Sequence, residues 1–283
     1  QTSGAGAADY VQPQYKIEAQ DIANSGWNYT DSNSFITLSF WVKASVAGDY
    51  TLNMNTHDGT PYRYLMEYSL LANTWKHVVF KIPGNSNLTV NNDNGLGLQI
   101  MWYPFLGSNY IQADQENNWY ASSNGKYGTV STTNWWTTND ATWEITGVQL
   151  EVGDTATTFE HRSHGDELQR CQRYCVVYGG SGSRHLGTAS AYNSTNLNLS
   201  IHLPVSMRDT PNTSTVTTGG NWLQSYVGAS GNNSNATISI ADMDEDHHTI
   251  RVYLQNAHSG LSAGQALWIH TLANAKLILS AEL

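Results

Sequence analysis

Residues 141–178 read ATWEITGVQLEVGDTATTFEHRSHGDELQRCQRYCVVY, and this stretch divides the chain. Its first part, Ala141–Val152, alternates with the period of a β-strand, and Gly153-Asp154 ends that strand. Thr155–His161 has no periodicity, so we expect an irregular strap there. A short helical pattern over His164–Arg173 leads into the new β-like sequence of Val176–Tyr178. The stretch therefore predicts the last strand of one β-domain, a strap, a short helix and the entry to a second β-domain.

The clearest strand signal of the chain is FITLSFWVKA, Phe35–Ala44. Its even-numbered apolar residues share one face, which predicts a core side. The other face carries the large aromatics Phe35 and Trp41, which either meet a second layer or are free for a ligand. Further strands are predicted at Val11–Gln20, Tyr50–Asn55, Tyr62–Leu70, Thr74–Pro83, Gly95–Tyr103, Ser183–Tyr192, Asn196–His202, Ser214–Thr218, Asn221–Val227, Ala236–Ala241, His248–Gln255, Ala266–Thr271 and Ala275–Leu283.

Many short strands with turn signals between them, and no long helical pattern, are typical of an all-β protein. At 283 residues the chain is long enough for two domains, each with its own core. We predict two β-sandwich, jelly-roll-like domains joined by a strap and a short helix. The expected boundaries are a linker at 1–10, a first sandwich at 11–153, the strap and helix at 154–175, and a second sandwich at 176–283.

The composition narrows the classes of partner. Only 13% of the residues are charged, against 40% hydrophobic, and the 10 Trp and 16 Tyr argue against disorder. The net charge is −10 and the basic residues do not cluster, so we expect no nucleic-acid partner. No apolar run approaches the ~20 residues that cross a bilayer, so we expect no membrane insertion. Because Gln1 stands where an initiator Met would, we expect the chain to be a portion of something longer.

The 2 cysteines, Cys171 and Cys175, are spaced i, i+4 in the predicted helix. A disulfide at that spacing would be strained, so two small buried thiols are expected in its place. The sequence therefore gives no evidence of disulfide stapling.

The strap and helix resemble the junction of many bacteriophage tail-fibre and appendage proteins, notably those of marine phages. Their pattern is Q-L-E-x-G-x-x-A-T-x-F-E-x-R followed by E-L-x-x-C-Q-R-Y. Here Gly147–Glu151, Thr155–Glu160 and Glu167–Tyr174 carry it, although the family often has Pro at the position of Thr158. The resemblance implies a virion location in a tail appendage, contacts with other virion proteins, and a homotrimer. It would place near the threefold axis the junction residues Glu167, Leu168, Cys171, Gln172 and Tyr174.

A second resemblance covers about Tyr15–Val152. FITLSFWVKASVAGDYTLNMN, followed by the W-x-x-x-x-F-x-I-P of Trp75–Pro83, is similar to the jelly-roll carbohydrate-binding modules attached to xylanases and related glycosidases. The similarity implies a sandwich fold for this half of the chain, and it is compatible with glycan binding.

Between the last strands of the first domain the sequence is rich in aromatic residues interleaved with Asn, Gln and Asp. Sugar rings stack on aromatic faces and their hydroxyls need amides or carboxylates, so this mixture suits a glycan platform. The same residue types also favour packing and protein interfaces. The adjacent Trp135-Trp136 pair is the sharpest case, since in a strand one of the two rings must point away from the core. The candidate platform residues are Trp102, Tyr103, Tyr110, Trp119, Tyr120, Trp135 and Trp136.

The acidic run at 242–246 is a weak candidate metal site. Its Asp242, Asp244 and Asp246 have the D-x-D-x-D spacing of a calcium loop, but the glycine and the final glutamate of that loop are missing. A solvated hairpin turn is the simpler interpretation. The polar cluster at His161–Glu167 is likewise explained by a helix start with Ser163 or Asp166 as its cap.

No catalytic motif is recognisable: the sequence has no nucleophile elbow, zinc-binding His motif or phosphate loop, and no carboxylate pair is selected by spacing. We therefore predict a protein that is not an enzyme and needs no cofactor. The leading hypothesis is a distal tail-fibre, receptor-binding segment that contacts host surface polysaccharide. The alternatives are a capsid or tail decoration protein that makes only protein contacts, and a carbohydrate-binding module of a secreted glycosidase.

Overall fold

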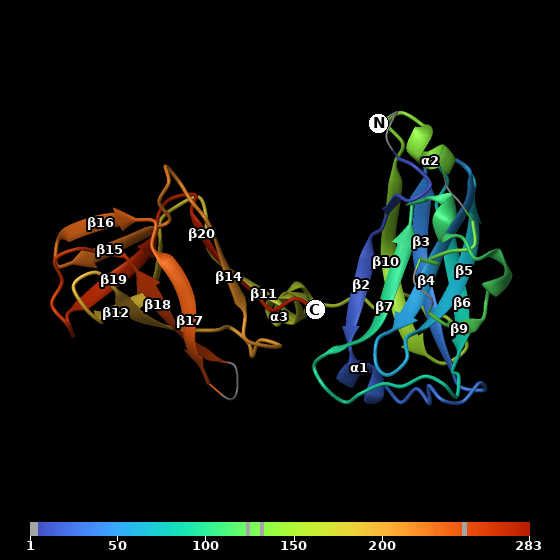
Figure 1. Ribbon diagram of the computed structural model, residues 1–283, viewed down its shortest axis with the longest axis horizontal. Helices are drawn as coiled ribbons and strands as arrows, with labels where there is room; N and C mark the ends of the chain where they lie inside the picture. Colours follow the sequence, from blue (N-terminus) through green and yellow to red (C-terminus); the bar gives the residue numbers. More distant parts are fainter. Residues whose placement is uncertain (1–4, 123–124, 131–132, 245–247) are drawn as a thin grey trace. The chain divides into compact units, whose positions relative to one another are not determined.

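The protein is all-β, with several antiparallel sheets built into sandwiches. The computed structural model describes residues 5–122, 125–130, 133–244 and 248–283 (Figure 1). It comprises two compact units, Gln1–His161 together with Leu283, and Arg162–Glu282. Each unit has its own hydrophobic core, as the length and patterning of the sequence predict.

The first unit packs a three-stranded sheet against a five-stranded sheet. The smaller sheet has the order β10-β3-β6, with β3 at Phe35–Ala44, β6 at Lys76–Pro83 and β10 at Trp143–Val152. The larger has the order β2-β7-β4-β5-β9, with bounds Gln14–Glu18, Leu96–Tyr103, Gly48–Thr56, Tyr62–Leu70 and Trp119–Ala121. The remaining elements are β1 (Tyr10–Val11), α1 (Ala19–Ala23), β8 (Phe105–Leu106), the 3-10 turns η1 (Ser108–Tyr110) and η2 (Ala113–Gln115), and α2 (Thr133–Thr137).

The core of this unit follows the predicted alternation. Leu38, Phe40 and Val42 of β3 are fully buried and face Leu52 and Met54 of β4 in one cluster. Burying apolar area in this way stabilises the sandwich by about 25 cal/mol per Å². The opposite side of β3 is left to Ser39, Trp41 and their neighbours.

A β-bulge interrupts the pairing of β10 with β3. Thr146 pairs with Trp41 and Gln149 with Ser39, so two residues, Gly147 and Val148, lie opposite one. Gly147 has a φ of +59°, the left-handed conformation that glycine adopts at the first position of such bulges. The extra residue explains why the alternation read from Trp143 does not continue unbroken to Val152.

The expected boundaries of the first unit need correction at both ends. Residues 1–10 are not simply a linker, since Tyr10 belongs to β1 and the Asp9 carbonyl accepts a hydrogen bond from Gly107 N. Residues 154–161, predicted to form part of a separate connection, belong to the first unit. Long-range hydrogen bonds to the sandwich fix both segments, and an aperiodic sequence carries no signal of such bonds.

The second unit packs a seven-stranded sheet against a three-stranded one around a single core. The seven-stranded sheet has the order β16-β15-β19-β12-β13-β18-β17, with bounds Ser230–Ser234, Leu223–Val227, Ala266–Thr271, Arg184–Ala191, Leu197–His202, Thr249–Gln255 and Thr237–Met243. The other has the order β11-β20-β14, with bounds Cys175–Gly179, Lys276–Ser280 and Asn212–Val216. Trp222, fully buried, donates from its Nε1 to the Ala236 carbonyl at 2.8 Å.

The predicted helix is present as α3, His164–Gln172. Ser163 caps it by accepting a hydrogen bond from Asp166 N at 3.2 Å, while Asp166 pairs with Arg170 one turn later at 3.4 Å. In the described part of the chain, α3 buries none of its 9 residues. Cys171 is exposed and Cys175 half-buried, both as free thiols, so the prediction of two buried thiols is wrong for Cys171.

Candidate functional site

The outer face of the β10-β3-β6 sheet presents aromatic side chains away from the core. Trp41 of β3 lies directly opposite His77 of β6 in the sheet register. Their rings stack with centroids 5.0 Å apart and planes 23° from parallel. Trp41 is nevertheless 44% exposed, so part of its surface remains open to a ligand.

The segment after β10 folds back over this same face. Gln149 and Glu151 of β10 point outward and hold it: Gln149 Oε1 accepts from Glu160 N at 2.8 Å, and Glu151 Oε1 accepts from Thr157 N at 2.8 Å. Thr157 Oγ1 also donates to Glu151 Oε2 at 2.7 Å. We call residues 154–161 the strap. Its sequence lacks periodicity because two side chains of β10, rather than a strand partner, satisfy part of its backbone.

Charge and backbone bonds fix the start of the strap. Asp154 pairs with Lys81 of β6 at 3.1 Å, both groups being well exposed. Gly153 N donates to the Phe35 carbonyl at 2.9 Å, and its own carbonyl accepts from Thr37 Oγ1 at 2.8 Å. An exposed ion pair contributes little, so the turn is held mainly by the hydrogen bonds.

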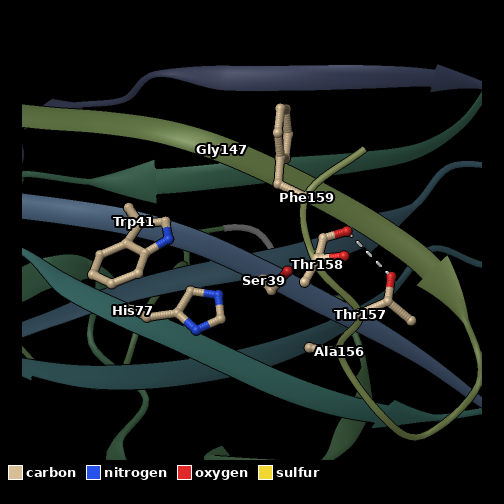
Figure 2. Close-up of a pocket in the computed structure, with 8 residues that line it drawn as sticks. All are labelled: Ser39, Trp41, His77, Gly147, Ala156, Thr157, Thr158 and Phe159. Atoms are coloured by element: carbon tan, nitrogen blue, oxygen red, sulfur yellow. Dashed lines mark hydrogen bonds between the residues drawn. The ribbon is translucent and has the colours of Figure 1, made fainter. Parts of the chain in front are cut away.

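Between the strap and the aromatic pair lies a groove of about 330 Å³, shown in Figure 2. Pockets for small ligands begin at about 300 Å³, so the groove is large enough for one. Phe159 of the strap, 43% exposed, lies on the other side of Gly147 from Trp41. The groove is lined by Ser39, Trp41, His77, Gly147, Ala156, Thr157, Thr158 and Phe159.

The bulge glycine contributes to the shape of the groove. A Cβ built on Gly147 would lie 3.4 Å from Trp41 Cδ1 and 3.9 Å from Phe159 Cδ2. The absence of a side chain there keeps the space between the two rings open.

The lining suits a ligand with apolar ring faces and hydroxyl groups. Trp41, His77 and Phe159 offer aromatic surface, while Ser39 and Thr158 offer hydroxyls that can both donate and accept hydrogen bonds; the Thr157 hydroxyl already donates to Glu151. The 8 lining residues include no Asp or Glu, so the groove itself holds no pair of carboxylates for glycoside hydrolysis. These residues offer a ligand aromatic surface and hydroxyl groups.

The Glu151 carboxylate that holds the strap is electrostatically tuned. Partial burial acts to raise its pKa, but hydrogen bonds from the Thr157 backbone, the Thr157 hydroxyl and Gln149 outweigh it, and the net pKa is lowered. The charged form is therefore favoured.

The aromatic residues predicted to form a glycan platform are mostly packed inside the unit. Trp102, Tyr103, Trp119 and Trp135 are at most 9% exposed, which favours the packing alternative for these four. Burial also raises the pKa of the Tyr103 hydroxyl. Tyr110, Tyr120 and Trp136 are half-buried.

Two clusters account for several of these rings. Tyr103 and Tyr110 pack with Tyr127 and Tyr10, the Tyr110–Tyr127 centroids being 4.9 Å apart. Trp119 packs on Tyr64 at 5.3 Å and donates to the Pro83 carbonyl at 2.6 Å. These rings therefore pack within the first unit: Trp119 belongs to its main core, and Tyr103 to a smaller buried cluster against which Tyr110 packs.

The interpretation of Trp135-Trp136 as part of a strand is wrong, because both lie in α2. Trp135 Nε1 donates to the Thr142 carbonyl at 3.1 Å, and Trp136 packs on Phe105 at 5.4 Å. The packing of both rings stabilises the helix here, and it outweighs the weak intrinsic helix propensity of Trp.

The predicted oligomer and metal residues lie elsewhere in the chain. Glu167, Leu168 and Cys171 are exposed on α3, while Gln172 and Tyr174 are half-buried at its end. Asp242 forms an exposed ion pair with Arg251 at 3.7 Å, and Asp244 Oδ1 accepts from the backbone of His248 and Thr249. These contacts support the hairpin-turn interpretation. Asp246 lies outside the described residues.

The sequence carried partial signals for the groove. The alternation of Phe35–Ala44 placed Trp41 on the outer face, and the pattern of Thr74–Pro83 placed His77 on one face of its strand. Phe159 and the strap threonines had no alternation signal. The tail-fibre-like motif Q-L-E-x-G-x-x-A-T-x-F-E-x-R, which includes Thr157 and Phe159, was the signal that pointed to this segment.

No protein-family model matches the chain, and a search of curated proteins finds no relative. Within the described residues, none of the helices is both long and apolar enough to span a membrane. Over the same residues no three or more His, Cys, Asp and Glu side chains are grouped so as to hold a metal ion.

Proposed function

We propose that this chain is a non-enzymatic binding protein whose first unit binds a saccharide in the groove beside the strap. The observation that carries the proposal is the stacked, 44% exposed Trp41 ring facing strap hydroxyls across an open groove. Aromatic faces bind the C–H faces of sugars, and hydroxyls complete the recognition. The similarity of Tyr15–Val152 to carbohydrate-binding modules supports the same class of ligand.

Within that role, we favour the distal part of a bacteriophage tail fibre that recognises host surface glycan. The support is the tail-fibre-like motif of Gly147–Glu151, Thr155–Glu160 and Glu167–Tyr174, together with the low content of charged residues. A decoration protein that makes only protein contacts is the main rival, and a module of a secreted glycosidase is the second.

A glycan array followed by titration calorimetry tests the groove. The wild-type chain should bind at least one glycan, and Trp41→Ala should weaken that binding at least tenfold. Trp268→Ala is the matched control, since Trp268 is 62% exposed in the second unit and outside the groove. Absence of binding to every glycan on the array, or equal binding by Trp41→Ala and wild type, would contradict the saccharide proposal and favour a protein that makes only protein contacts.

Self-association through α3 is a further part of the proposal. A 9-residue helix with no buried residue is too short to be stable by its own hydrogen bonds, so α3 needs a covering partner. Leu168, 45% exposed, is the apolar side chain that a second copy would cover. We propose a homotrimer, as the family resemblance implies.

Light scattering after size-exclusion chromatography measures the assembly. The wild type should elute with three times the mass of one chain, and Leu168→Lys should shift it toward the monomer. Leu71→Lys, at a position 73% exposed in the first unit, should leave the mass unchanged. A monomeric wild type at micromolar concentration would contradict the trimer.

A further inference from the structure

A bulge in the second unit places two histidines opposite each other. Thr188 pairs with Trp268 and Gly187 with Ile269, after which the register shifts so that His185 pairs with His270. Leu186 is the extra residue. Without it His185 would continue the alternation onto the core side; with it His185 faces outward beside His270. Bulges that re-aim a side chain in this way are over-represented next to functional sites.

The two imidazoles have a separation that suits a shared metal ion. Their centroids are 5.1 Å apart, with the ring planes 75° from parallel. A Zn–N bond of about 2.05 Å puts each ring centre about 3.2 Å from the ion, and tetrahedral ligands then have centroids about 5.2 Å apart. The observed separation matches that geometry.

Among the residues that the structure describes, neither imidazole makes a hydrogen bond: the His185 ring contacts the His270 ring, which also contacts the ring of Tyr226. His185 is exposed and His270 half-buried, so an ion can reach the pair from solvent.

Gln224 and Tyr226 border the histidine pair on the outer face of the sheet. Gln224 of β15 lies opposite His270 on the strand next to β19, so the order across the sheet is Gln224, His270, His185. All three face away from the core, because their neighbours Leu223 and Ile269 are buried in it. The Tyr226 ring, 5.6 Å from the His270 ring, borders the same place.

We propose that His185 and His270 bind one divalent late first-row transition-metal ion, of the class of Zn²⁺, Ni²⁺ and Cu²⁺. Water completes its coordination. Imidazole ligands select these ions over Mg²⁺ and Ca²⁺, which prefer all-oxygen sites. This site is separate in sequence and chemistry from the saccharide groove.

Calorimetric titration of the full chain with ZnCl₂ and NiCl₂ tests the site, with MgCl₂ as the negative control. The wild type should bind Zn²⁺, while His185→Ala and His270→Ala should each weaken binding at least tenfold. His202→Ala is the matched control, because His202 is also an exposed histidine of this unit but contacts Thr249 in place of a second imidazole. Its affinity should equal that of the wild type.

Two results would overturn the proposal: absence of Zn²⁺ binding by the wild type, or unchanged affinity in both His185→Ala and His270→Ala. A loss confined to Asp244→Asn would instead assign binding to the acidic hairpin and would equally overturn it. Since both histidines lie on the surface, their alanine variants should keep the wild-type circular dichroism spectrum. Nuclear magnetic resonance gives an independent readout, because Zn²⁺ should shift the ring-proton signals of these two histidines before those of His202.

Discussion

At the scale of single residues, Gly147 has two roles in the first unit. It allows the bulge that changes the phase of β10, and its missing side chain leaves the space between Trp41 and Phe159 open. The φ of +59° costs other residues roughly 1–2 kcal/mol. A conformational role and a role in shaping the groove therefore coincide at one position.

We expect Gly147→Ala to destabilise the first unit by about 1–2 kcal/mol, because the left-handed conformation disfavours a Cβ. Urea denaturation followed by tryptophan fluorescence measures the change. Gly165→Ala in α3 is the opposite control: the site is open and its φ is ordinary, so alanine should stabilise the helix by about 0.5–1 kcal/mol. Equal stability of Gly147→Ala and the wild type would show that the bulge relaxes without cost.

At the scale of elements, the strap is held by side chains of the strand that precedes it. We expect Gln149→Ala to speed hydrogen exchange at the Glu160 amide and Glu151→Ala to speed it at the Thr157 amide, since each substitution removes that amide's acceptor. Nuclear magnetic resonance resolves the two amides separately. Gln149→Glu, which retains an acceptor oxygen, serves as the control for Gln149→Ala. Fast exchange at both amides in the wild type would contradict the role of Gln149 and Glu151 in holding the strap.

The hydrogen bonds between Glu151 and the strap should weaken in acid. The pKa of Glu151 is lowered from 4.5 in the folded state, so its charged form stabilises the strap above about pH 4.5, and this stabilisation is lost as pH falls through the folded pKa. We expect the Thr157 amide of the wild type to lose protection as the pH falls below about 4.5. Glu151→Gln has no charge to lose, so its protection should vary much less over the same change of pH. An identical pH profile for the two proteins would contradict this role.

Some elements could be predicted because pattern and environment agree. β3 and β5 occur at the predicted bounds, Phe35–Ala44 and Tyr62–Leu70, where one side of each strand faces the core. β16, Ser230–Ser234, was missed because SGNNS carries no strand signal. It forms as the hairpin partner of β15, and the Tyr226 ring lies over Gly231, where a Cβ would come within 2.7 Å of it.

The candidate site, too, could be predicted from the sequence only in part. Trp41 and His77 could be placed on a face by period-two alternation, but nothing in the sequence said that those two faces meet as neighbouring strands. The predicted platform failed where tertiary packing governs, as at Trp102 and Trp119, which fill the core. The pairing of His185 with His270 depends on a one-residue bulge, which a strand pattern does not reveal.

At the scale of the whole molecule, the chain divides at His161 rather than at Gly153. We expect residues 1–161 to fold alone with the melting temperature that the first unit has in the full chain. Residues 1–153 should melt lower, by about 2–4 °C for each kcal/mol lost with the strap. Differential scanning calorimetry of the two fragments measures this. Equal melting temperatures would mean that the strap adds nothing to stability.

The hydrogen bonds by which Gln149 and Glu151 hold the strap give the Q-L-E motif a structural explanation. Gln149, Glu151 and Gly153 end the last strand of the sandwich and hold the segment that follows it against the outer face of the same sheet. A sequence search with this motif would therefore find proteins that share this way of ending a β-sandwich, whatever their function or source. Trp41 and His77 of the proposed saccharide groove lie outside the motif, so differences in ligand specificity among chains that carry it should be sought at the positions of those two residues.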